Sequence, residues 1–291
     1  MATGQGKYII CSIRGESEAL EAGAWVLFES GAEGVVQDED GSPGTVSAYF
    51  PQSRWKSIKP VILKNLEPAQ AQFPSLKLSG EVQVDPADWT EKWKEFHKPV
   101  TMGSLWIGPP WLTDEADPDK TRLVIDPGQA FGTGGHETTR ICLALLMSLI
   151  RDGAEGPLLD VGTGSGVLAL AGALLGLESV LALDNDPLAL EAAKENAKAN
   201  GLADRVEISG TDLSGIEDKF PLITANLTGL ILKANAKDLI RLLPPQGRLI
   251  LSGILIDETD DIRRIFRELS FIKAIEIGEW TGLIMQKPGE A

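Results

Sequence analysis

Downstream of residue 157, short apolar runs alternate with stretches in which apolar residues recur every three or four positions. Runs of this length predict buried strands, and the three-to-four spacing predicts amphipathic helices. The predicted strands are 158–161, 179–183, 206–209, 222–225, 248–252, 272–278 and 282–286, and the predicted helices are 167–177, 187–200, 230–243 and 257–269. This alternation predicts an α/β domain whose parallel sheet is covered on both faces. The last two strands lack an intervening helix, which predicts an antiparallel C-terminal hairpin.

The N-terminal part of the chain carries a different pattern. Strand-like runs at 7–13, 34–37, 45–50 and 76–84 are separated by helical spacing at 16–30 and 55–66. The order β-α-β-β-α-β predicts a small ferredoxin-like α+β domain over residues 1–85. Trp89, Trp93 and Phe96 recur at helical spacing, which predicts a connecting helix or linker over residues 86–100. This aromatic stripe either packs on a domain or forms a surface for a partner.

The remaining residues, 101–291, form the larger predicted domain, which begins with strands at 100–107 and 121–125 ahead of the parallel sheet. The whole chain has 291 residues, with 42 acidic and 27 basic side chains and a formal net charge of −15. An acidic surface repels phosphate backbones, so nucleic acid is not expected as a direct partner. It attracts a basic protein, although acidity also simply maintains solubility.

Composition excludes several other classes. No apolar run approaches the roughly 18 to 20 residues of a membrane span, and the N-terminus lacks the pattern of a secretion signal. Cys11 and Cys142 are far apart and predict buried thiols rather than a disulfide. Two histidines and two cysteines lack the spacing of a metal site, so no metal is expected. We therefore expect a cytoplasmic protein that contacts no membrane. We also expect a monomer, although the composition does not determine the oligomeric state.

The segment 158–168 joins a predicted strand to a predicted helix through three alternating glycines. Asp160 precedes Gly162, Gly164 and Gly166, and Val167 follows them. A dinucleotide-binding turn needs its third glycine at position 167, which disfavours an oxidoreductase. An acid two residues before the first of three alternating glycines resembles the first motif of S-adenosylmethionine-dependent methyltransferases. Another nucleotide-binding fold is the alternative interpretation.

Further candidates lie where the predicted strands end, which is where open parallel sheets bind their ligands. Asp184 lies 22 residues after Gly162 and is placed to accept hydrogen bonds from both hydroxyls of a ribose. Asp186 is the rival for this role, although its place before Pro187 also predicts a helix N-cap. Asp212 follows the third strand, where it contacts an adenine amino group or forms a turn.

Asn226 ends the fourth strand, and its amide has a carbonyl to accept from an amine and an NH2 group to donate. Leu227 and Thr228 follow it, without the prolines and aromatic ring of enzymes that methylate planar amides and adenines. Upstream, the glycine-rich segment 126–135, which contains Phe131, leads into a predicted helix that starts near Thr139. Free N–H groups at that helix start predict a site for the carboxylate in the methionine part of S-adenosylmethionine. A loop with an ordinary threonine cap is the alternative, and His136 is assigned no base role.

Together the motifs 131–139, 160–166, 184–187 and 226–227 resemble the bacterial ribosomal protein L11 methyltransferases over essentially the whole chain. The resemblance implies a class I methyltransferase Rossmann-like domain, with S-adenosylmethionine converted to S-adenosylhomocysteine. The cofactor contacts it implies are Thr139, Gly162, Asp184 and Asn226, and we add Phe131 and Gly164. Asn226 is the expected catalytic residue.

The resemblance also implies the substrate. The family methylates lysine side chains and the N-terminal amine of the ribosomal stalk protein, which its N-terminal domain recognises. The sequence departs from the family pattern at two places: Thr163 replaces a common cysteine, and Leu227-Thr228 replaces isoleucine-leucine. The alternatives are a lysine methyltransferase of another protein, such as an electron-transfer flavoprotein, and a module that binds the cofactor without catalysis. The N-terminal domain disfavours the first, and the complete set of cofactor residues disfavours the second.

Overall fold

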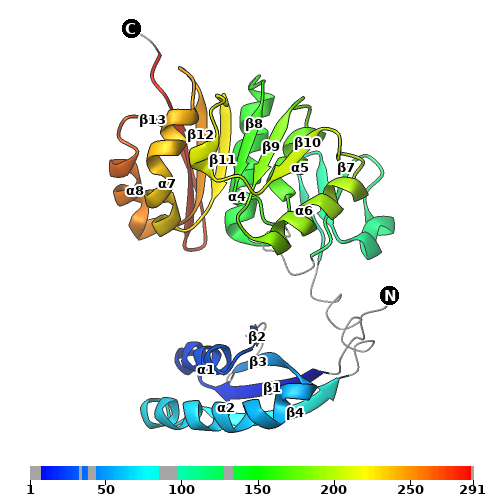
Figure 1. The fold of residues 1–291 in the computed structure, drawn as a ribbon, viewed down its shortest axis with the longest axis vertical. Coiled ribbons are helices and arrows are strands. Elements are labelled where there is room, and N and C mark those ends of the chain that lie inside the picture. The colour runs from blue at the N-terminus through cyan, green and yellow to red at the C-terminus, as the bar shows by residue number, and fades with distance from the viewer. Residues whose placement is uncertain (1–7, 33–34, 39–43, 85–97, 128–133, 290–291) are drawn as a thin grey trace. The chain divides into compact units, whose positions relative to one another are not determined.

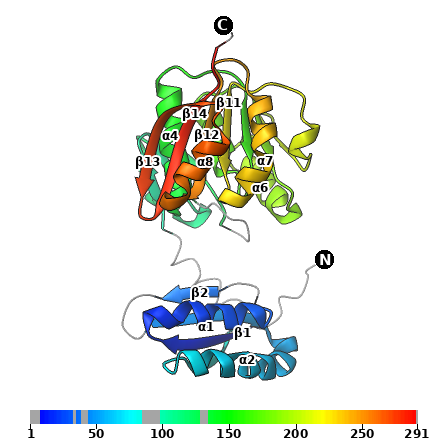
Figure 2. The same cartoon turned by 90° about the vertical axis from the view of Figure 1, so that its left-hand side faces the viewer.

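The computed structural model describes residues 8–32, 35–38, 44–84, 98–127 and 134–289. The chain divides into two compact units, Met1–Phe96 and His97–Ala291, which Figures 1 and 2 show in blue to cyan and in green to red. Residues 86–97 of the predicted connector, with its aromatic stripe, lie outside the described residues.

The N-terminal unit has the predicted order of elements. These are β1 (Tyr8–Gly15), α1 (Ser17–Glu29), β2 (Val35–Asp38), β3 (Gly44–Pro51), α2 (Gln52–Gln72) and β4 (Lys77–Val84). The strands form an antiparallel sheet in the order β2-β3-β1-β4. Its core joins alternate strand residues such as Ile13 and Phe50 to Leu27 of α1 and Ile62 of α2. The helix α2 extends beyond the predicted 55–66 at both ends.

The second unit begins with a small sheet and continues as repeated strand–helix units. Its first elements are β5 (Val100–Met102), β6 (Leu105–Gly108), the 3-10 helix η1 (Pro110–Glu115), β7 (Thr121–Val124) and α4 (Glu137–Arg151). One strand was expected over 100–107, and this expectation is wrong. The chain reverses at Gly103, whose φ of +55° suits a glycine, so that β5 and β6 pair antiparallel.

The main sheet has seven strands in the order β10-β9-β8-β11-β12-β14-β13. Its elements are β8 (Leu158–Val161), α5 (Val167–Leu174), β9 (Val180–Leu183), α6 (Pro187–Ala199), β10 (Val206–Ser209), η2 (Leu213–Gly215), β11 (Leu222–Asn226), α7 (Gly229–Leu242), β12 (Arg248–Leu255), η3 (Ile256–Glu258), α8 (Thr259–Ile265), β13 (Ser270–Ile277) and β14 (Trp280–Gln286). The strands β8 to β12 pair in parallel, and β14 is antiparallel to β12 and β13. The predicted parallel sheet and closing hairpin are confirmed, whereas the helix expected over 257–269 is a 3-10 turn followed by the shorter α8.

Successive strand residues enter cores on opposite faces of the main sheet. Leu158 packs with residues of α4, α5 and α6, and Leu159 packs with residues of α7 and α8. This alternation follows from the pleat of a strand and explains why the strands are apolar throughout. The helices cover both faces of the sheet (Figure 1).

Both cysteines are buried and free, in separate units. Burial raises the pKa of the Cys11 thiol to about 12, and it raises the pKa of Cys142 as well. Among the described helices, none combines the length and apolar character that a membrane crossing requires. Across the described part of the chain, no three His, Cys, Asp or Glu side chains lie together in a way that could hold a metal ion.

Candidate active site

The sheet order brings three of the predicted residues to one edge. The strand β8 lies between β9 and β11, and all three run in the same direction. Gly162 follows β8, Asp184 follows β9, and Asn226 ends β11. The chain order reverses between β8 and β11, which is the switch point at which open α/β sheets bind ligands.

The glycine turn needs its glycines for backbone conformation. Gly162, Gly164 and Gly166 have φ values of +73°, +55° and +84°, which other residues adopt only with strain. The Gly162 N–H donates to the Leu183 carbonyl at 2.8 Å, which ties the turn to the end of β9. A Cβ at position 162 would overlap the Cδ2 atom of Leu227. The turn therefore presents bare backbone, which lets a ligand approach closely.

Asp184 faces this turn. Its Oδ2 accepts from the Gly164 N–H at 2.9 Å, its Oδ1 accepts from the Asp186 N–H at 3.0 Å, and its side chain is partly exposed. The rival Asp186 instead caps α6, because its Oδ1 accepts from the Leu188 N–H at 2.9 Å and Pro187 begins the helix. The geometry therefore separates the two carboxylates into a site residue and a helix cap.

Asn226 and Thr139 come together from segments 87 residues apart. The Asn226 Nδ2 donates to the Thr139 Oγ1 at 3.4 Å, and Thr139 is fully buried in the first turn of α4. The start of α4 is held by the Ser252 hydroxyl, which donates to the Thr138 carbonyl at 3.2 Å. His136 caps the helix, since its Nδ1 accepts from the Thr138 N–H at 3.3 Å. The cap is therefore a histidine, not the threonine that was the alternative.

Asp160 has a structural role that the sequence pattern did not reveal. Its carboxylate is fully buried and accepts from Thr224 Oγ1 at 2.6 Å and Thr163 Oγ1 at 2.7 Å. Burial raises the pKa of Asp160, and the hydrogen bonds from Thr224, Thr163 and the backbone of Ala169 oppose that rise. Thr163, which departs from the family's cysteine, thus supplies a donor that fixes the glycine turn to β8.

Thr163 and Thr224 share one sequence feature that could have marked them as donors to Asp160. Each is a small hydroxyl side chain in an otherwise apolar or glycine-rich run, and Thr224 lies opposite Asp160 in the β8–β11 register.

Phe131 lies outside the described residues. Asp212 is exposed, and its carbonyl accepts from the Gly215 N–H at 2.8 Å in a 3-10 turn. Its contact with an adenine stays a prediction.

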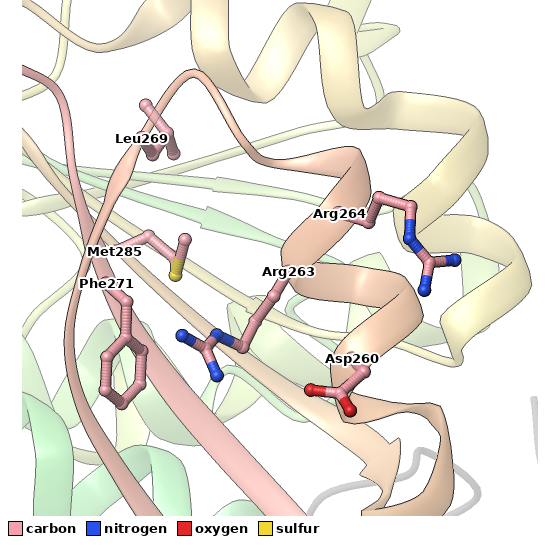
Figure 3. A pocket seen from close by; sticks show the side chains of 6 residues that line it. All are labelled: Asp260, Arg263, Arg264, Leu269, Phe271 and Met285. Atoms are coloured by element: carbon pink, nitrogen blue, oxygen red, sulfur yellow. The ribbon is translucent and has the colours of Figure 1, made fainter.

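A hollow in the described residues lies apart from this edge. It lies at β13 and α8 and is lined by Asp260, Arg263, Arg264, Leu269, Phe271 and Met285 (Figure 3). The Arg263 guanidinium lies 4.4 Å from the centre of the Phe271 ring. None of the predicted site residues lines this hollow, and β12 and β14 separate β13 from β11 in the sheet.

A sheet of this order, with a glycine turn after one central strand and an acid after its neighbour, defines a class I methyltransferase. Enzymes of this class take their methyl group from S-adenosylmethionine. A family model described as Ribosomal protein L11 methyltransferase (PrmA) matches residues 7–288.

Individual relatives match over nearly the full length. The chain is 34% identical to the ribosomal protein L11 methyltransferase of Caldicellulosiruptor saccharolyticus, over 97% of this chain and 100% of that protein. It is 34% identical to that of Myxococcus xanthus, over 96% and 99%. A crystal structure of ribosomal protein L11 methylase from Lactobacillus delbrueckii subsp. bulgaricus has a TM-score of 0.59 and 32% identity, over 65% of this chain and 98% of that one. The chain belongs to the ribosomal protein L11 methyltransferase family.

Proposed function

We propose that this protein transfers methyl groups from S-adenosylmethionine to amino groups of ribosomal protein L11, both lysine side chains and the N-terminal amine. The observation that carries the proposal is the convergence of Thr139, Gly164, Asp184 and Asn226 at one edge of the sheet. The full-length similarity to proteins named for methylation of ribosomal protein L11 identifies the acceptor.

The residues at this edge fit the cofactor. Glycine at position 162 lets the turn pack directly on Leu227, next to Asn226, because any side chain there would overlap Leu227. Asp184 would accept from the ribose hydroxyls beside the Gly164 N–H. Thr139 and the N-terminus of α4, a helix of 15 residues, would hold the methionine carboxylate. Asn226 reaches the same place through its contact with Thr139.

The chemistry needs an uncharged amine beside the reactive methyl. When bound, S-adenosylmethionine would supply a methyl group on a positively charged sulfur. The uncharged amine would take this methyl as the carbon–sulfur bond breaks, leaving S-adenosylhomocysteine, and the methylated amine would then release a proton to water. A lysine has an unperturbed pKa near 10.4, so about one in 2,500 is neutral at pH 7. Desolvation and the neighbouring positive charge both lower the pKa of the amine as it enters. The Asn226 carbonyl would orient the amine, and this arrangement requires no general base from the protein.

The N-terminal unit is the proposed recognition surface for ribosomal protein L11. The side chains of Trp25 and Phe28, one turn apart on α1, are 63% and 61% exposed. The same helix carries three glutamates and no lysine or arginine. Exposed aromatics on a helix of net negative charge are suited to binding a basic protein. Replacing both aromatics with alanine should raise the KM for the protein substrate and leave the dissociation constant of the cofactor unchanged.

The test is a methyl-transfer assay with labelled S-adenosylmethionine and purified ribosomal protein L11 from the organism that makes this protein. The product is analysed by mass spectrometry. We expect mass increments of 14 Da per methyl on lysines and the N-terminal amine, with an Asn226→Ala variant as the slow control. The same assay with an electron-transfer flavoprotein tests the alternative. Transfer to that protein alone, or modification of other residue types on ribosomal protein L11, would contradict the proposal.

A further inference from the structure

The helix α6 contacts two segments of the site through one buried amide. Asn196 is 2% exposed, and its Nδ2 donates to the Ser165 carbonyl in the glycine turn at 2.9 Å. Its Oδ1 accepts from the Asp126 N–H, two residues after β7, at 2.9 Å. Asp126 begins the stretch of chain that leads into α4 and Thr139. One side chain therefore bridges the glycine turn and the approach to α4.

A second asparagine, which directly follows the last residue of α6, contacts only one of these segments. The Asn200 Nδ2 donates to the Val124 carbonyl at 2.6 Å, and the Asn200 Oδ1 accepts from the Val124 N–H at 2.8 Å. Asn200 thus holds the end of β7 as a neighbouring strand would. The structure gives it no hydrogen bond to the glycine turn, so it serves as an internal comparison for Asn196.

The helix also packs directly on the turn. A Cβ at Gly166 would lie 3.3 Å from the Cβ of Ala193, one turn before Asn196. The Ser165 carbonyl belongs to the peptide that leads into Gly166, whose φ is +84°. Fixing that carbonyl therefore fixes the orientation of the last peptide of the turn.

We infer that Asn196 is a positioning residue for cofactor binding, acting through Ser165 and Asp126 rather than by contact with the ligand. The inference rests on the proposed function of the site. The bridge joins a backbone carbonyl to a backbone N–H, so the side chain must donate on one side and accept on the other. A neutral amide does both, whereas an ionised carboxylate only accepts. Burial makes the loss of either partner costly.

The test compares Asn196→Asp with the matched control Asn200→Asp by titration calorimetry with S-adenosylhomocysteine. At pH 8 we expect Asn196→Asp to weaken binding about tenfold, the effect of one lost buried hydrogen bond, and Asn200→Asp to stay within about twofold. The weakening should shrink as the pH is lowered toward 5, because a protonated carboxyl at position 196 donates to Ser165 again. Equal effects of the two variants, or an effect of Asn196→Asp that does not change with pH, would overturn the inference.

A measurement on the wild-type protein keeps the inference testable if a variant fails to fold. Coupling between the bridge and the ligand is reciprocal, so binding should stabilise the bridge. Hydrogen exchange at the Asp126 amide should slow when S-adenosylhomocysteine is added, with the Val124 amide unchanged. Equal exchange at the Asp126 amide with and without the ligand would overturn the inference about Asn196 and leave the proposed function unaffected. A wild-type chain that takes up no S-adenosylhomocysteine would overturn the proposed function and the inference together.

Discussion

Replacing Gly162 with alanine tests whether the bare glycine turn forms the cofactor site. The residue has a φ of +73°, and an alanine in that region costs about 1 kcal/mol of unfolding free energy. The added Cβ also overlaps the Leu227 Cδ2, and overpacking of this kind costs a further 1 to 3 kcal/mol or so. We therefore expect a loss of about 2 to 4 kcal/mol in chemical denaturation. Displacement of Leu227, next to Asn226, should also weaken binding of S-adenosylhomocysteine in calorimetry.

Gly201 provides the matched control. Its φ is +67°, and a Cβ there would meet open space. Gly201→Ala should therefore cost only the backbone strain of about 1 kcal/mol and leave cofactor binding intact. Adding Leu227→Ala to Gly162→Ala should recover the overlap part of the loss. A Gly162→Ala variant that costs no more than Gly201→Ala and binds S-adenosylhomocysteine with wild-type affinity would show that this turn does not form the cofactor site.

Three further substitutions test the remaining contacts. Thr224→Val removes a donor from buried Asp160 and should cost about 1 to 3 kcal/mol at pH 8. Burial raises the pKa of Asp160 in the folded chain, so the contribution of Asp160 to stability is present at low pH and falls as the pH rises. Thr224→Val raises that pKa further, so thermal unfolding should show a larger loss of stability at pH 8 than at pH 5. An equal loss at the two pH values would contradict this. Asp184→Asn should weaken S-adenosylhomocysteine about 10- to 100-fold in calorimetry with little change in Tm; unchanged affinity would exclude the ribose role. Asn226→Ala should lower kcat for methyl transfer while the cofactor still binds, and unaltered turnover would exclude its orienting role.

The larger domain could be predicted from the sequence because the residues that end its strands and begin its helices lie next to those elements in the chain. The glycines after Val161 and the Asp186-Pro187 cap mark where strands stop and helices start, and the apolar runs between them have the lengths of buried strands. The same local signals place Gly162, Asp184 and Asn226 at strand ends. Parallel pairing then brings strand ends to one edge without any further information.

The parts that were missed depend on contacts between distant residues. The hydrogen bond from Thr224 to Asp160 joins positions 64 apart, and that from the Asp126 N–H to Asn196 joins positions 70 apart. Asn196 lies at helical spacing from the buried Ala189 and Ala193, but the helix pattern does not reveal its hydrogen-bond partners, because they lie in other segments. The reversal at Gly103 was missed because apolar residues continue on both sides of it. Local periodicity cannot distinguish one strand from two short paired ones at such a place.

We expect Thr139, the glycine turn, Asp184 and Asn226 to form one cofactor pocket. A crystal structure of the full chain with S-adenosylhomocysteine tests it most directly. We expect the ribose hydroxyls to lie on the Asp184 carboxylate and the amino-acid end of the ligand to lie toward Thr139 and Asn226. Ligand bound elsewhere, for example in the hollow beside Phe271, with this edge of the sheet unoccupied, would contradict it.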